Sequence, residues 1–170
     1  MPRTLLLILI VVMNLFSSCG FYDQKAKQVF YELVSGTNDS LDRMTTDWHR
    51  ILDRSKITKN FAALAPFRNK MGLFISRNRA KIADIEVPQS LAGLRDSEEV
   101  FLSTQANIIS DAYPAFEPFN DITPEDDIQN QMKLVANDLE TETSFSEAIR
   151  KSLRAYAQSN RLKPPHITKN

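Results

Sequence analysis

The chain has one cysteine, Cys19, and four glycines among its 170 residues. With one cysteine, no intramolecular disulfide can form, and no Cys-x-x-Cys-His motif is present for covalent haem attachment. Glycine supplies many turns of all-β proteins, so its scarcity, together with long amphipathic stretches, disfavours an all-β fold. These shortages favour a helical domain that is stabilised by packing alone.

The chain also lacks an excess of positive or negative charge. Its 21 Lys and Arg residues balance its 21 Asp and Glu residues, so it carries no formal net charge. A nucleic-acid partner is therefore not expected, because nucleic-acid binding depends on a basic field.

Groups suited to catalysis are equally scarce. The two histidines are His49 and His166, and the paired Glu-x-x-His motifs of a di-iron bundle are missing. A non-covalent haem would need His49 together with a methionine, but His49 follows an expected core residue and is more consistent with a flanking position. Neither Gly-x-Ser-x-Gly nor Ser-x-x-Lys occurs. We therefore predict no enzymatic activity, no metal and no cofactor.

The first residues form a targeting segment. Arg3 precedes an unbroken apolar run at residues 5–13, which is shorter than the roughly 20 residues of a membrane span. Residues 15–19 read LFSSC, with small residues directly before Cys19. This pattern predicts a cleaved signal peptide over residues 1–18. An ordinary cleavage site beside a free thiol is the alternative.

The stretch at residues 15–19 resembles the lipobox of bacterial lipoproteins, with Phe16 where leucine is usual. The resemblance implies that the sulfur of Cys19 takes a diacylglyceryl group and that its amine is acylated after cleavage, so that membrane lipid is reached through acylated Cys19. Gly20 follows, where some bacteria use aspartate to retain lipoproteins in the inner membrane. This favours the outer membrane and leaves the membrane face open.

Helical spacing of apolar residues dominates the rest of the chain. It predicts helices at about 23–54, 58–85, 89–113 (extending to 119 if the last turn continues) and 124–160. The short connections favour an all-α fold, an antiparallel up-down-up-down four-helix bundle over residues 19–163, with a short tail at 164–170. The expected core positions are Phe30, Val34, Thr37, Leu41, Met44, Trp48 and Ile51; Phe61, Leu64, Arg68, Met71, Ile75, Asn78, Ile82 and Ile85; Leu91, Leu94, Glu98, Phe101, Gln105, Ile108 and Ala112; and Ile128, Met132, Val135, Leu139, Phe145, Ile149, Leu153 and Tyr156.

Local signals refine these helices. The apolar pattern keeps its phase across Gly36, which favours one long first helix. Pro66 belongs in a first turn or at a kink, and Pro114 predicts a broken end to the third helix. Thr123 is expected to cap the fourth helix with Pro124 at its first position.

Two features could mark a binding site. Polar residues at core positions, among them Glu98 and Gln105, indicate either polar layers that set the helix register or a polar pocket. The second feature is an aromatic run, Tyr113, Phe116 and Phe119, which would bind a partner protein if exposed and otherwise would cap the core.

The order of lipobox, four helices, a last helix opening at residues 122–126 (ITPED) and an end at residues 156–162 (YAQSNRL) resembles an uncharacterised family of small helical bacterial surface lipoproteins. The resemblance implies an envelope location and supplies no catalytic residues. The functional hypothesis is a membrane-anchored, non-enzymatic bundle that binds another envelope protein or is structural. The alternative is a small-ligand or cofactor carrier that uses the bundle interior.

Overall fold

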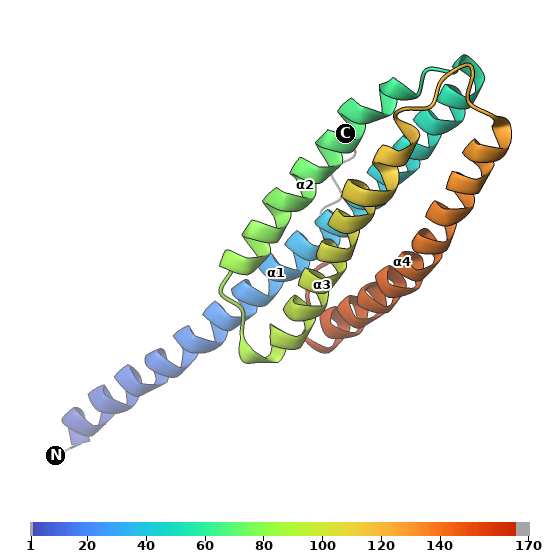
Figure 1. Ribbon diagram of the computed structural model, residues 1–170. Helices are drawn as coiled ribbons and strands as arrows, with labels where there is room; N and C mark the ends of the chain where they lie inside the picture. Colours follow the sequence, from blue (N-terminus) through green and yellow to red (C-terminus); the bar gives the residue numbers. More distant parts are fainter. Residues whose placement is uncertain (1, 166–170) are drawn as a thin grey trace.

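The computed structural model describes the backbone of residues 2–165 and the side chains of residues 23–137, 140 and 143–165. Within this part the chain is all-helical, as the sequence predicts (Figure 1). The long helices are α1 (Pro2–Thr58), α2 (Leu64–Asp84), α3 (Ala92–Asn107) and α4 (Glu125–Ser159). Shorter helical segments join them: η1 (Phe61–Ala63), η2 (Gln89–Leu91), η3 (Ile108–Ala112) and η4 (Tyr113–Phe116).

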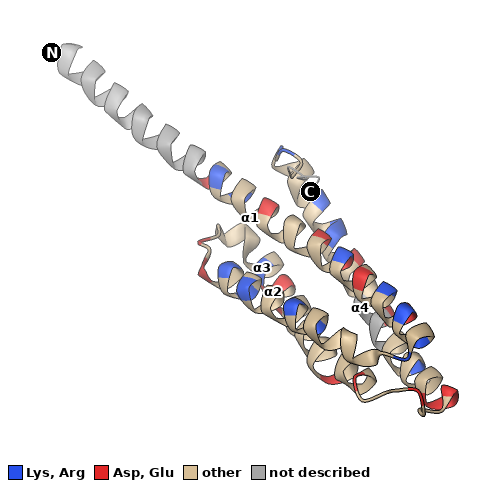
Figure 2. Cartoon of the chain, turned by 90° about the horizontal axis from the view of Figure 1, so that it is seen from above, with Lys and Arg blue, Asp and Glu red and all other residues tan. Residues whose placement is uncertain are grey.

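The four long helices lie side by side around one core. Both α1 and α3 pack against α2 and against α4. Figure 1 shows the α1–α2 and α3–α4 connections at one end of the molecule and the α2–α3 connection at the other. Figure 2 shows Lys and Arg interspersed with Asp and Glu along α1, in keeping with the balanced composition.

The core follows the expected stripes closely. Its largest fully buried side chains are Trp48, Tyr113, Phe30, Phe61, Phe101, Phe116, Leu41, Leu64, Met71, Ile75, Ile82 and Leu91. In α1 the expected positions are buried except Met44 and Ile51, which are half-buried. Arg68 in α2 is also only half-buried, because its guanidinium reaches Glu117. The remaining expected positions that are half-buried are Ile85, Leu94, Ala112, Met132, Phe145 and Tyr156. Leu139 lies outside the described side chains.

Helix α1 is continuous through Gly36, which confirms the prediction of one long helix. Pro66 lies in the first turn of α2, where its missing N–H removes no intrahelical bond. The predicted break before the end of the third helix is also confirmed. There α3 passes into the π-helical segment η3, and the 3-10 segment η4 contains Pro114.

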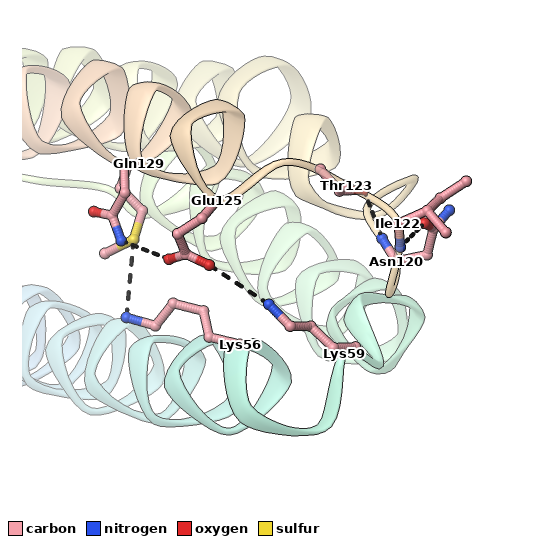
Figure 3. A network of polar contacts seen from close by, with 8 residues as sticks. Lys56, Lys59, Asn120, Ile122, Thr123, Glu125 and Gln129 are labelled. Carbon is pink, nitrogen blue, oxygen red and sulfur yellow. Dashed lines mark hydrogen bonds and ion pairs between the residues drawn. The ribbon is translucent and has the colours of Figure 1, made fainter.

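The start of α4 differs from the prediction by one residue. Pro124 is the N-cap, and its carbonyl accepts the Asp127 N–H at 3.1 Å. The hydroxyl of Thr123 instead accepts the Asn120 N–H at 2.9 Å, which closes the preceding turn (Figure 3). The prediction was wrong because the same hydroxyl can satisfy a turn or a helix end, and the turn uses it here.

Contacts with neighbouring residues stabilise both ends of α4. Lys59, just after α1, lies 3.5 Å from the carboxylate of Glu125 (Figure 3). At the other end Asn160 is the C-cap. Arg161 then takes a positive φ of 54°, and the Leu162 N–H bonds the Ala157 carbonyl at 2.9 Å, a Schellman-type closure.

Candidate functional site

The predicted aromatic site lies mainly in the core. Tyr113 is 2% exposed and Phe116 is 0% exposed, whereas Phe119 is half-buried. The ring of Tyr113 stacks on Trp48 with centroids 3.7 Å apart, and Phe116 meets Trp48 edge-on at 5.6 Å. A partner site here required exposure, and Tyr113 and Phe116 do not meet that condition. They close the core instead, which was the alternative interpretation.

The predicted lipidation site and its surroundings are not described at the side-chain level. Cys19 and the predicted signal peptide at 1–18 lie outside the described side chains, and residues 166–170, with His166, lie outside the described backbone. Among the described residues, no helix is both long and apolar enough to cross a membrane. The same residues contain no group of three His, Cys, Asp or Glu side chains suited to a metal ion.

The polar residues at core positions do not form one pocket. The amide of Asn78 bonds the Phe74 carbonyl of its own helix at 2.8 Å. Arg68 donates to Glu117 at 2.5 Å, where both side chains are partly exposed. The Gln105 amide nitrogen is buried and has no hydrogen-bond partner among the described residues.

Glu98 is the exception, because it bonds across the bundle. Its Oε2 accepts the Nδ2 N–H of Asn38 at 3.2 Å, and the two residues are 0% and 1% exposed. Burial raises the pKa of Glu98 to about 7, and the hydrogen bond from Asn38 opposes that rise. A buried carboxylate is costly, so the neutral acid is favoured over an unusually wide pH range.

A groove between α1 and α4 is the main candidate binding surface. Its volume is about 380 Å³. It is lined only by polar side chains, namely Asp42, Thr45, Thr46 and His49 from α1 and Thr143, Ser146, Glu147 and Arg150 from α4. On each helix these residues follow the i, i+3, i+4, i+7 spacing of one helical face. The two helices therefore meet here through facing rows of hydrogen-bonding groups.

The groove contains one ion pair and one histidine whose pKa is shifted. Arg150 forms an ion pair with Asp42, which links α4 to α1. Half-burial lowers the pKa of His49, while Asp53 opposes the shift. The ring of His49 meets Trp48 edge-on at 5.3 Å. A neutral imidazole, a guanidinium, carboxylates and hydroxyls are thus available to a polar ligand or partner.

Sequence reasoning missed this groove for a simple reason. Polar residues at helical spacing line every solvent-facing helix surface, so the pattern at 42–49 has no distinguishing mark. Only the placement of α4 against α1 brings the second row, at 143–150, opposite the first.

Comparisons with known proteins add no assignment. Nothing matches this chain significantly among protein-family models, curated proteins or solved structures. The resemblance to small helical surface lipoproteins therefore remains a prediction.

Proposed function

We propose that this chain is a lipid-anchored, non-enzymatic protein of the bacterial envelope, built as an antiparallel up-down-up-down four-helix bundle, whose α1–α4 face binds another envelope protein. The observation that carries the anchor is Cys19 in its lipobox-like stretch, directly after the apolar run at 5–13. The alternation of the connections between the two ends of the molecule supports the bundle topology (Figure 1).

The spacing between anchor and bundle supports a position close to the membrane. Phe30 is the first fully buried core residue, and helical rise places it roughly 16 Å along the chain from Cys19. A short connection of this kind would hold the α2–α3 end of the bundle near the membrane surface. The opposite end and the long sides would remain open to partners.

The groove lined by Thr46 and Arg150 supports a protein-binding role. Interfaces between proteins combine direct hydrogen bonds with trapped water, and this groove offers hydrogen-bonding groups along facing turns of two helices. The interior offers less room for a carrier function, because Trp48 and its aromatic neighbours fill the core beside the α3–α4 connection.

Replacement of Cys19 tests the anchor. In the Cys19→Ala variant we expect no labelling by a fatty-acid analogue and accumulation of uncleaved precursor, because the sulfur that accepts the lipid is gone. Labelling is read after purification from the membrane fraction, with Ser18→Ala as the control that keeps the cysteine and a small residue before it. Lipid labelling that persists without Cys19 would refute the proposal.

A further inference from the structure

The Asn38–Glu98 pair lies in the middle of the core. Since α1 and α3 each pack against both α2 and α4, the two helices that carry the pair stand on a diagonal of the bundle. The hydrogen bond between Asn38 and Glu98 therefore crosses the core and does not follow a surface seam.

The single hydrogen bond leaves one polar atom of each side chain unpaired. Asn38 Oδ1 and Glu98 Oε1 are both buried, and neither has a hydrogen-bond partner among the described residues. Two unpaired acceptors in the core are costly, because each has lost its water without gaining a hydrogen bond. A carboxylic acid removes both costs, because its O–H donates to the amide oxygen while its carbonyl accepts the amide N–H.

We propose that Asn38 and Glu98 form a proton-operated lock between α1 and α3, closed by a reciprocal acid–amide pair when Glu98 holds its proton and released when the proton leaves. In the closed form Glu98 Oε1 carries the proton and donates to Asn38 Oδ1. Loss of the proton removes the bond to Asn38 Oδ1 and leaves a core carboxylate with a single hydrogen bond, an arrangement that favours movement of Glu98 toward water. The lock does not depend on the lipid anchor.

Two of the cations near the pair form ion pairs with other acids. The hollow beside Asn38 is lined by the titratable or charged side chains of Tyr31 and Asp39 on α1 and of Arg150 and Arg154 on α4. Glu99, next to Glu98 on α3, faces Arg79 on α2. Arg79 pairs with Glu99, and Arg150 pairs with Asp42. Burial is thus the main influence on the pKa of Glu98.

A hollow beside Asn38 shows where the released form could relax. Its volume is about 190 Å³, and Asn38, Arg150 and Arg154 contribute to its lining. An ionised Glu98 would gain solvation by moving toward this hollow and its two guanidinium groups. Such a movement would break the hydrogen bond between Asn38 on α1 and Glu98 on α3, so release should be visible as faster amide exchange in both helices.

The sign of the pH dependence follows from the raised pKa. In the unfolded chain Glu98 titrates near its ordinary value of 4.5, and in the folded chain at about 7. The lock therefore stabilises the fold fully below about pH 4.5 and loses its contribution as the pH rises through about 7. The unfolding equilibrium constant should rise on the order of 100-fold across this window.

The decisive experiment is denaturant unfolding of the full chain, purified in detergent, from about pH 5 to about pH 9. In Glu98→Gln the amide can donate to Asn38 Oδ1 and accept from Asn38 Nδ2 at every pH, so we expect a loss of the Glu98 pH dependence and greater stability at alkaline pH. Glu99→Gln is the matched control, since it removes the adjacent, partly exposed carboxylate and should keep the wild-type dependence.

Two further measurements keep the result unambiguous. The contribution of His49 to the pH dependence of stability has the opposite sign, because its pKa is lowered in the folded chain and stability is therefore lost as the pH falls. All variants contain His49, so this contribution cancels in the difference between their stability curves. In the unmodified chain, the carboxyl-carbon NMR signal of Glu98 should titrate near 7, with faster amide exchange in α1 and α3 above that pH. A Glu98 midpoint near 4.5, or an unchanged pH dependence in Glu98→Gln, would overturn the lock.

Discussion

At the scale of single residues, the aromatic group around Trp48 closes the core beside the α3–α4 connection. Its indole is stacked on Tyr113 and meets Phe116 edge-on, and all three rings are almost fully buried. Such contacts add roughly 0.5–1.5 kcal/mol per pair to the burial of the rings. The irregular segments η3 and η4 place Tyr113 and Phe116 where a continuous α-helix would not.

Truncation of Phe116 tests this role. Phe116→Ala should lower the free energy of unfolding by about 3–5 kcal/mol, because a fully buried ring is replaced by a cavity. Chemical denaturation at one pH measures the change. Ile122→Ala is the control, since Ile122 is 84% exposed in the same region, and a change within about 0.5 kcal/mol is expected there. Similar effects for the two variants would contradict the core assignment of Phe116.

At the scale of elements, α1 owes its continuity to packing more than to local preference. Gly36 lies inside the helix, where glycine is less favourable than alanine by about 0.8–1.0 kcal/mol. The buried residues on either side of it, Val34 and Leu41, hold the helix in register with its neighbours. Tertiary contacts therefore outweigh a local break signal.

Substitution of Gly36 should strengthen the helix. A Cβ at this position meets no atom within 4 Å among the described residues. Gly36→Ala should therefore raise the free energy of unfolding by about 0.5–1 kcal/mol, as read from thermal and denaturant unfolding. Gly93→Ala, in the first turn of α3, should give a smaller gain because first-turn positions depend less on helix propensity. A loss of stability in Gly36→Ala would indicate that α1 needs flexibility there.

At the scale of the whole molecule, the proposed function needs two separate features, an anchor that attaches the protein and a groove that binds a partner. The anchor would orient the bundle, and the α1–α4 groove lies along its side with the Asp42–Arg150 ion pair across it. A partner that docks beside the membrane would reach this face without approaching the core. The proposal thus assigns attachment and recognition to different parts of the chain.

Site-directed cross-linking tests the recognition face. A photoreactive residue at Thr46, in the groove, should give a discrete adduct with one envelope protein in the native host. The same residue at Arg77, exposed on α2, is the control and should not give that adduct. An equal adduct from both positions, or none from Thr46, would argue against the groove as the binding face.

Much of the fold was predictable because its signals are local. A repeat of about 3.6 residues marks the buried side of each helix, and Pro66 and Pro114 mark a helix start and a helix break. The cap of α4 was misplaced by one residue, since Thr123 can bond either the turn or the helix. The burial of Tyr113 and Phe116 stayed open, because exposure depends on where other helices lie.

The sequence alone determined the all-helical class, the approximate helix limits and the candidate anchor at Cys19, because each depends on residues close together in the chain. The tertiary structure decided which side chains meet across the bundle. Asn38 and Glu98 are 60 positions apart, and Asp42 and Arg150 are 108 apart. Their pairing depends on the rotation and register of whole helices, which the periodicity of a single helix leaves undetermined.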